Sequence, residues 1–369
     1  MNFNFFIHAF VFLTCFLQSK EQVLGIGDAV IDLLTPIQDN LLLDHSYLKK
    51  GGWSSAYEPS KIEQLIHTNQ LSVKVIPGGS AANTIRVLAK LGEACGFYGC
   101  IGNDVYGELF RKNICSYGIG DNLEIIPGYT TSHILCLITP DAQRSFFGYT
   151  EKIKTSFLSE EAFANVKWVH LEAWQFRKRS NLEKIIELSK LNGASVSIDL
   201  SSYDLVSEFK EEILDYISRY SLVVFCNEDE IKSLTNLNPE EGCFFLQTMS
   251  PLVVVTQGSK GCLIGTNDQV LKIPTFSAEA IDTTAAGDYF TGGFLYGLLR
   301  GYPLVTCARI GNKLGSTIVK FIGSELPDES WENIGVFLKQ ETSKANDSID
   351  CMSDHSEQEL LDLTTNFQS

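Results

Sequence analysis

The sequence lacks the spacings that mark several common kinds of site. Its ten cysteines include no Cys-x-x-Cys pair, and its histidines form no cluster. This pattern excludes the usual zinc modules and is typical of reduced, buried thiols. The sequence also lacks the Gly-x-x-x-x-Gly-Lys-Ser/Thr loop of the commonest nucleotide triphosphate fold. Residues 25–30 lack the third glycine of the dinucleotide-binding fingerprint.

Positive charge and long apolar runs are scarce as well. Lys and Arg total 29 against 45 Asp and Glu, for a net charge of −16, and no basic stripe offsets the excess. We therefore expect no nucleic-acid partner. Residues 3–17 are apolar but too short for a typical membrane span, and no basic residue precedes them. We interpret residues 1–20 as an apolar extension without stable membrane association; a signal or anchor is the alternative.

The rest of the composition predicts a large α/β domain. The chain has 369 residues, of which 44% are hydrophobic, enough for a sizeable core. Continuous apolar runs at residues 221–225 and 252–255 are typical of parallel strands that are covered on both faces. Residues 341–369 are strongly acidic and rich in Ser, Thr and Asn, which predicts a mobile tail.

The stretch from Asp282 to Arg300 places an acid at the start of an apolar helix. Ala285-Ala286-Gly287 leaves the preceding turn unobstructed, and the apolar residues after Asp288 repeat at helical spacing. Backbone N–H groups in a first helical turn lack intrahelical partners and can bind a phosphate. An acid beside such an anion site suits the deprotonation of a hydroxyl that attacks a phosphoryl group. On this segment alone, Asp288 could equally be a helix cap.

A second segment, Gly78-Gly79-Ser80-Ala81-Ala82-Asn83, also combines a small-residue turn with a helix start. Two glycines allow the backbone to approach a ligand closely. Asn83 lies one turn into the predicted helix, where its amide offers donors and an acceptor to hydroxyls. Considered alone, the segment is better explained by an ordinary strand-to-helix turn with Asn83 as a local cap.

Together the two segments resemble the two signatures of the ribokinase-like, or PfkB, family of carbohydrate and nucleoside kinases. Residues 23–32 resemble the first strand of that family, and residues 99–107 its Gly-x-x-Gly-x-Asp-x-x-Gly segment. The resemblance covers residues 22–323. The sequence departs from the family pattern at Ala285, where glycine is usual, and at Tyr289, where a smaller residue is usual.

The resemblance implies a doubly wound α/β sheet flanked by helices, with a small β-sheet lid. The kinase domain would span residues 21–340, with lid pieces at about 32–56 and 130–152. The resemblance further implies that Asp288 is the general base and that the amides of residues 285–288 form the anion hole: Ala285, Ala286, Gly287 and Asp288. Four residues would bind the hydroxyls of the acceptor: Asp28, Asp32, Gly79 and Asn83.

The resemblance also implies a site for ATP and Mg²⁺. Asn227 and Glu230 match the family's Asn-x-x-Glu motif, in which Glu230 would hold magnesium through ordered water. Without the family, this acidic run is a solvated helix start. Thr256 and Gly258 would contact ATP, and Asn312 would lie beside the adenine. As in some relatives, Asp282 could shape a monovalent-cation site.

The acceptor is inferred from residues 138–148, which resemble a segment of bacterial adenosine-kinase-like members. This favours a nucleoside phosphorylated at its 5′-hydroxyl, with Arg144 offsetting charge on the transferred phosphoryl group. Aromatic residues in segments that could line a lid suit a flat base, although ordinary core or lid packing explains each of them better: Trp53, Phe146, Phe147 and Trp174. A ribokinase- or fructokinase-like sugar kinase needs the same base and anion hole and remains the alternative. A catalytically silent nucleotide-binding scaffold is a second alternative.

The expected partners are therefore small molecules, a nucleoside or a sugar, together with ATP. Because ATP is scarce outside cells, we expect a cytoplasmic protein. It would be a monomer or a homodimer, since exposed edges of lid strands invite pairing.

Overall fold

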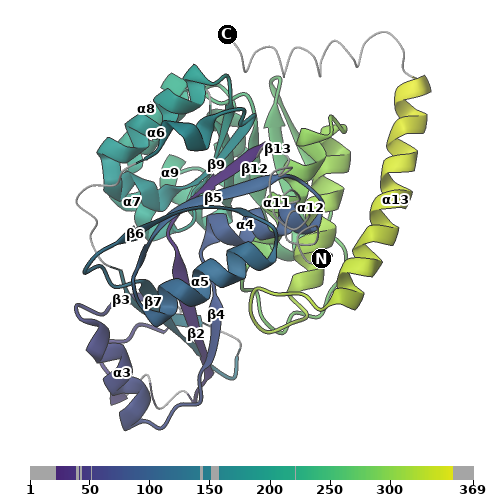
Figure 1. Ribbon diagram of the computed structural model, residues 1–369. Coiled ribbons are helices and arrows are strands. Elements are labelled where there is room, and N and C mark those ends of the chain that lie inside the picture. The colour runs from purple at the N-terminus through teal and green to yellow at the C-terminus, as the bar shows by residue number, and fades with distance from the viewer. Residues whose placement is uncertain are drawn as a thin grey trace, which may run out of the picture.

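A nine-stranded sheet forms the centre of the molecule (Figure 1). The computed structural model describes residues 22–351 except 39–40, 42–43, 51, 142–143, 151–157 and 221. The strand order is β14 (Gln269–Ile273), β13 (Cys262–Thr266), β12 (Val253–Thr256), β11 (Val223–Asn227), β10 (Ser195–Asp199), β9 (Trp168–Glu172), β1 (Val23–Ile26), β5 (Cys95–Gly102) and β6 (Gly120–Ile126). Neighbours from β12 to β6 are parallel, whereas β13 and β14 pair antiparallel. The predicted extension at residues 1–20 lies outside the described residues.

Two hydrophobic clusters lie on the two faces of this sheet. In β12, Val254 belongs to one cluster, while Val253 and Val255 belong to the other, as the alternation of a strand requires. One cluster includes α4 (Ser80–Lys90), α5 (Val105–Ser116), α11 (Ala286–Leu299) and α12 (Leu304–Ile318). The other includes α6 (Arg179–Leu191), α7 (Tyr203–Glu208), α8 (Lys210–Tyr220), α9 (Glu228–Thr235) and α10 (Pro239–Leu246). The predicted doubly wound α/β sheet is therefore confirmed.

A five-stranded sheet forms the lid and lies beside the large sheet (Figure 1). Its order is β3 (Trp53–Ser55), β8 (Arg144–Tyr149), β7 (Ser132–Ile138), β2 (Val30–Pro36) and β4 (Lys74–Pro77). Both expected lid pieces contribute strands. The sheet also includes β4, which pairs with β2, and the helix α3 (Pro59–Thr68) packs against β7 and β8. The lid is thus larger than the sequence indicated, because β4 is too short to be recognised without its partner.

The C-terminal helix α13 (Asp328–Cys351) continues past the predicted end of the kinase domain. Glu341 is buried and forms an ion pair with Arg309 of α12, and Phe337 packs edge-on against Phe276. The predicted tail boundary between residues 340 and 341 therefore falls inside a helix that is held by these contacts. The remainder of the predicted tail, residues 352–369, lies outside the described residues.

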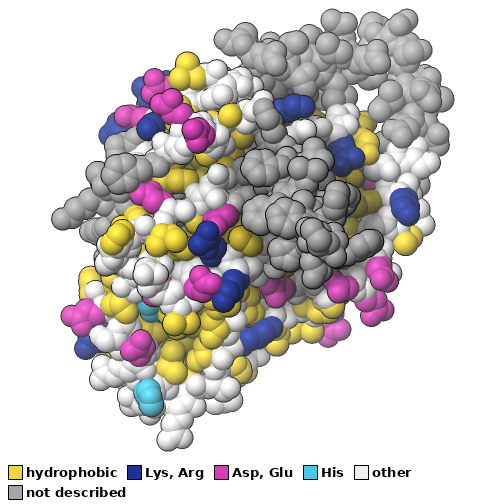
Figure 2. Space-filling model, viewed as in Figure 1, with side chains coloured by type: hydrophobic (Ala, Val, Ile, Leu, Met, Phe, Trp, Pro, Cys, Tyr) yellow, Lys and Arg dark blue, Asp and Glu magenta, His cyan; other side chains and the backbone are white. Residues whose placement is uncertain are grey.

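The described surface carries charges of both signs. On the face in Figure 2, Lys and Arg side chains are interspersed with Asp and Glu, and hydrophobic side chains are frequent over the lower part, where Figure 1 places the lid. Exposed Tyr47, Tyr57 and Val75 belong to this lid region. Within the part of the chain that the structure describes, no helix combines the length and the apolar character that crossing a membrane requires.

Among the histidines that the structure describes, the most deeply buried lies in the middle of the large sheet. His170 of β9 is 0% exposed, and its Nδ1 lies 2.9 Å from Ser197 Oγ, which also accepts from Trp168 Nε1 at 2.8 Å. Within the described residues, its Nε2 has no hydrogen-bond partner. Burial lowers the pKa of His170 to about 3. The folded protein therefore holds this imidazole neutral.

Because its pKa is lower in the folded than in the unfolded state, His170 makes the protein less stable as the pH falls below about 6.5. Between pH 7.5 and 5.5 this loss is about 1.4 kcal/mol. We predict that His170→Phe removes this part of the pH dependence, measured by urea unfolding at both pH values. His67→Phe, at an exposed position of α3, is the control. Equal pH dependence in the wild type and His170→Phe would contradict the prediction.

Candidate active site

The turn before α11 presents free backbone N–H groups. The N–H of Ala286 donates to Thr283 O at 3.3 Å, while those of Ala285, Gly287 and Asp288 have no acceptor among the described residues. Such groups at a helix N-terminus form a binding site for an anion. Ala285 adopts a left-handed φ of 58°, which costs an alanine roughly 1–2 kcal/mol. The surrounding structure therefore holds this turn in a strained conformation.

Gly287 leaves the approach to this turn open. A Cβ atom placed on Gly287 would meet nothing within 4 Å, and its φ is not in the left-handed region. Neither backbone strain nor packing within the protein therefore requires glycine at this position. The space in front of the free N–H groups is instead available to a ligand.

The carboxylate of Asp288 is held by two side chains from the start of α4. Ser80 Oγ donates to Oδ1 at 2.8 Å, and Asn83 Nδ2 donates to Oδ2 at 2.7 Å. Although Asp288 remains half-buried, the surrounding protein raises its pKa mainly by desolvation, while the Asn83 and Ser80 donors lower it. The two segments that the sequence singled out therefore meet at this carboxylate.

The two glycines before α4 allow the lid and the first strand to approach closely. A Cβ on Gly78 would lie 2.0 Å from Asp32 Oδ2, and a Cβ on Gly79 would lie 2.5 Å from the carbonyl oxygen of Asp28. Gly79 also has a φ of 90°, which favours glycine. Asp32 comes from β2 of the lid. Burial raises the pKa of Asp32 to about 7, Arg86 lowers it and Asp288 raises it.

Arg86 of α4 holds the glycine turn in place. Its guanidinium donates to Pro77 O at 2.7 Å and to Gly78 O at 2.9 Å, and it is 4% exposed. Its positive charge also acts on Asp32. The sequence analysis did not identify Arg86, because an arginine on the apolar side of a helix carries no local motif.

Asp28 lies two residues after the end of β1, in a cluster of charged side chains that are buried or partly buried. Lys178 Nζ forms an ion pair with Asp28 Oδ1 at 2.6 Å. Glu172, at the end of β9, accepts from the N–H of Asp28 at 2.6 Å and from the N–H of Ala81 at 3.1 Å. Burial, together with the charge of Asp28, raises the pKa of Glu172 to about 8. Through Glu172, this cluster joins Asp28 to the start of α4, the helix whose side chains bind the Asp288 carboxylate.

Arg144 connects the lid to the turn before α11. It extends from β8, and its guanidinium donates to Thr283 Oγ1 at 3.0 Å and to Thr284 Oγ1 at 2.5 Å, while Nε lies 3.5 Å from Asp282 Oδ1. Asp282 also accepts from the N–H of Gly323 at 2.9 Å. The lid is therefore docked on the segment that leads into α11, and Arg144 lies beside the free N–H groups.

The predicted aromatic residues divide between the two faces of the lid. Trp53 of β3 packs against Gly148 and lies 6.2 Å, between ring centroids, from Trp174 of the large domain. Phe146 lies under Arg144 on this same face. Phe147 points to the opposite face, where it packs against Tyr47. The tryptophan pair thus bridges the lid and the 3₁₀ helix η2 (Ala173–Lys178).

Thr256 and Gly258, two residues predicted to contact ATP, lie at the end of β12 and just after it, and Asn312 of α12 packs against the end of β14. Thr256 ends β12, and Gly258 begins the 3₁₀ helix η3 (Gly258–Lys260) with a φ of 53°. Asn312 is buried and donates to Ile273 O at 3.4 Å and to Pro274 O at 3.3 Å. Asn312 therefore supports the segment after β14.

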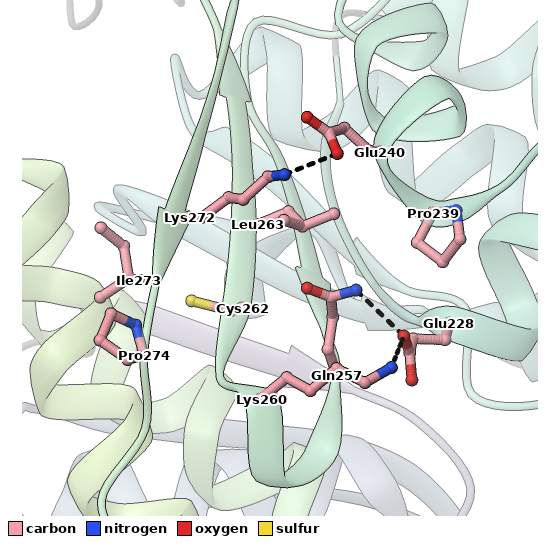
Figure 3. Close-up of a pocket in the computed structure, with 10 residues that line it drawn as sticks. All are labelled: Glu228, Pro239, Glu240, Gln257, Lys260, Cys262, Leu263, Lys272, Ile273 and Pro274. Atoms are coloured by element: carbon pink, nitrogen blue, oxygen red, sulfur yellow. Dashed lines mark hydrogen bonds and ion pairs between the residues drawn. The ribbon is translucent and has the colours of Figure 1, made fainter.

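A cavity of about 510 Å³ borders this region (Figure 3). Lys260 and Gln257 both donate to Glu228 at 3.0 Å on one side of it, and Lys272 pairs with Glu240 at 2.7 Å on the other. Thr256, Gly258 and Asn312 do not line it directly, although Gln257 and Lys260, which neighbour the first two, and Ile273 and Pro274, whose carbonyl groups bind Asn312, do. The cavity lies away from the residues predicted to bind the acceptor.

Asn227 and Glu230 form a capping box at the start of α9. Glu230 accepts from Asn227 N at 2.9 Å and from Asn227 Nδ2 at 2.7 Å. Burial and the nearby Asp199 raise the pKa of Glu230 to about 8, and burial and the charge of Asp288 raise the pKa of Asp199 to about 7. No positively charged side chain is among the causes of these shifts, so Glu230 and Asp199 lie where a bound cation would be favoured.

Asn227, Glu230 and Asp199 have the oxygen ligands that suit magnesium, but they do not form a complete coordination shell for it. Carboxylate and amide oxygens suit this hard cation. Among the described residues, no three His, Cys, Asp or Glu side chains are grouped closely enough to hold a metal. This fits a cation that keeps much of its water and binds partly through phosphate oxygens.

Comparison with known proteins places this geometry in a family. The sequence profile described as "pfkB family carbohydrate kinase" matches residues 55–331. The chain belongs to the PfkB family. It is therefore a kinase, and the family uses ATP as the phosphoryl donor.

Individual PfkB relatives act on different acceptors. A fructokinase from Vibrio alginolyticus is 27% identical over 67% of this chain and 86% of its own. An aminoimidazole riboside kinase from Salmonella typhimurium is 26% identical over 64% of this chain and 78% of its own. The crystal structure of adenosine kinase from Sinorhizobium meliloti has a TM-score of 0.78 at 23% identity, covering 84% of this chain and 96% of that one. These likenesses support a carbohydrate or nucleoside kinase and, for the last, the fold.

The sequence analysis missed several residues of this PfkB site. The sequence analysis assigned no role to Ser80, which donates to Asp288. Glu172 ends the apolar strand β9, and Lys178 ends the 3₁₀ helix η2 that follows it. Only the general rule that ligands bind at the carboxyl edge of a sheet could have indicated these two residues. Asp199 ends β10 at the same edge and could have been found in the same way.

We predict that Ser80→Ala moves the acidic limb of the pH profile of kcat/KM to higher pH. The Ser80 hydroxyl stabilises the ionised form of Asp288, so its removal raises the pKa of that carboxyl further. At neutral pH, kcat/KM should fall by about threefold to tenfold. Thr84→Val is the matched control, because Thr84 donates to the carbonyl oxygen of Asp288 and not to its carboxylate. An unchanged limb in Ser80→Ala would contradict this assignment.

Proposed function

We propose that this kinase transfers the γ-phosphoryl group of ATP to the 5′-hydroxyl of a nucleoside, with Asp288 as the general base. The observation that carries the proposal is the position of Asp288. Its carboxylate, held by Ser80 and Asn83, lies in the first turn of α11 beside free backbone N–H groups. This arrangement supports the proposal, because a carboxylate beside free N–H donors suits proton removal next to a phosphoryl group.

In this mechanism the acceptor hydroxyl binds between Asp288 and the glycine turn before α4. Asp288 would take the proton as the hydroxyl oxygen attacks the γ-phosphorus of ATP in line, while the bond from that phosphorus to the bridging oxygen of the β-phosphate breaks and ADP leaves. The N–H groups of Ala285, Gly287 and Asp288 stabilise the charge that develops on the transferred group. Arg144 adds positive charge from the lid, and the docked lid excludes water.

The donor would lie along β11 to β14. Asn227 and Glu230 would hold magnesium through water, with Asp199 nearby to balance its charge. When bound, magnesium would neutralise charge on the phosphates of ATP. Thr256 and Gly258 would contact the phosphates or ribose of ATP, and Asn312 would support the segment beside the base. We propose Asp282 as a candidate for shaping a monovalent-cation site, since it lies in the turn before α11.

The preference for a nucleoside rests on the aromatic bridge at the edge of the lid. Trp174 belongs to η2, which also carries the Gln175 and Lys178 side chains that contact Asp28, and together with Trp53 it offers aromatic surface to a base. The named activities of the adenosine kinase and the riboside kinase are consistent with this acceptor class. A sugar kinase is the second candidate, favoured by the fructokinase relative, because the base and anion site serve either acceptor.

We also propose a cytoplasmic location, on the ground that the reaction consumes ATP. The edge strands β3 and β4 of the lid sheet offer a surface for a homodimer, and Val75 of β4 is exposed. A monomer remains the alternative.

We predict that the purified protein consumes Mg-ATP when adenosine or another nucleoside is supplied, and that Asp288→Asn reduces turnover by roughly two orders of magnitude or more. Acceptor binding should remain close to normal, since asparagine preserves the shape of the side chain. The assay offers adenosine, guanosine, inosine, cytidine, ribose and fructose separately. Turnover only on free sugars would favour the sugar-kinase alternative, and no turnover on any of them would favour the scaffold. Unchanged turnover in Asp288→Asn would refute the assignment of the base.

The variant Gly287→Ala tests phosphate binding independently of the stability of the fold. We predict that this variant unfolds at a temperature no lower than the wild type, because the new Cβ meets no protein atom and alanine favours a helix. Its kcat/KM for ATP should nevertheless fall by about tenfold or more, since the methyl group occupies the approach to the free N–H groups. Gly335→Ala in α13 is the matched control, because its Cβ also meets no atom within 4 Å. Equal activity of the two variants would count against the anion site.

A further inference from the structure

Two oppositely charged side chains lie together beside the acceptor side of the site. Lys178, the last residue of η2, places its Nζ 2.6 Å from Asp28 Oδ1, and Gln175 Nε2 lies 3.5 Å from the same oxygen. The side chains of Lys178 and Asp28 are 17% and 22% exposed, so both are largely buried yet reachable. A pair of this kind has a large desolvation cost unless its remaining hydrogen-bonding groups are satisfied.

The pair is tied directly to the candidate catalytic residue. Glu172 accepts from the N–H of Asp28 with one carboxylate oxygen and from the N–H of Ala81 with the other. Ala81 follows Ser80, which donates to Asp288. Three hydrogen bonds and one peptide bond therefore link Asp28 to Asp288, and Lys178 and Asp288 face the same edge of the sheet.

The pair retains unused hydrogen-bonding capacity. An ammonium group has three N–H donors and a carboxylate has two acceptor oxygens. Within the described residues, the one hydrogen-bond partner of the Lys178 ammonium is Asp28 Oδ1, and Asp28 Oδ2 has no partner. A hydroxyl is both a donor and an acceptor, so it can donate to Oδ2 and accept from Nζ at the same time. Two adjacent hydroxyls match the Lys178 ammonium and the Asp28 carboxylate better than one hydroxyl does, because each group can then bind its own hydroxyl.

We propose that Lys178 is a specificity-determining residue of the acceptor site and that, with Asp28, it selects an acceptor with a vicinal diol, such as an unmodified ribose, over its deoxy analogue. This inference rests on the proposed function, since it assumes that the acceptor binds between Asp28 and Asp288. A deoxy acceptor leaves a charged donor or acceptor without a partner, which disfavours its binding. An acceptor with both hydroxyls satisfies the pair without moving it.

The experiment compares Lys178→Met with Lys190→Met, a control at an exposed lysine of α6 whose Nζ lies over the ring of Tyr220. Calorimetry gives Kd, and ATP consumption gives KM and kcat, for adenosine, 2′-deoxyadenosine and 3′-deoxyadenosine, with ribose and 2-deoxyribose as the sugar pair. We expect the wild type and Lys190→Met to bind the diol about tenfold to a hundredfold more tightly than the deoxy analogue. In Lys178→Met this ratio should fall to about threefold or less, mainly through a higher Kd and KM for the diol.

A purely structural ion pair would lower the unfolding temperature of Lys178→Met without changing the ratio between diol and deoxy acceptor, and that result would overturn the proposal. Absence of a preference in the wild type would overturn it as well. Asp28→Asn is a second variant in case Lys178→Met does not fold, and it should lose the preference in the same way. If no acceptor is phosphorylated but the binding preference and its loss are observed, the proposed reaction fails while this inference stands.

Discussion

One negative charge, on Asp288, lies at the positive end of α11, and the arrangement of the site depends on keeping that charge both ionised and reachable. Burial opposes the ionised form, while the donors from Ser80 and Asn83 and the helix N-terminus favour it. The balance leaves a carboxyl group with a raised pKa beside unoccupied N–H donors. A stronger set of donors would lower the pKa of this carboxyl group, and more complete burial would raise it further.

Keeping the charge reachable requires that the backbone itself come close to the ligand. Small residues serve this purpose at both helix starts, where Gly78 lies against Asp32 and Gly287 faces open space. Two arginines help to hold these turns in place. Arg86 binds the carbonyl groups of the glycine turn, and Arg144 binds the threonines before α11. Removing either would loosen the backbone that forms the site.

The site also gathers several carboxyl groups in a chain whose net charge is −16. The pKa values of Asp32, Asp199, Glu172 and Glu230 are all raised by burial. Within the protein, Arg86, Arg144 and Lys178 offset part of this charge. On the donor side, by contrast, Asp199 and Glu230 repel each other, which is consistent with the binding of a cation together with ATP.

The sequence by itself determined the features that depend on local rules. The continuous apolar strands, the free first turn of α11 and the glycine turn before α4 all follow from neighbouring residues. Tertiary structure decided the rest, because contacts between distant segments leave no local pattern. Ser80 meets Asp288 across 208 positions, and Tyr289, which no local rule explained, donates to Ser324 O and stacks on Trp331 of α13. The pairing of Lys178 with Asp28, like the pairing of β4 with the lid, exists only once the chain has folded.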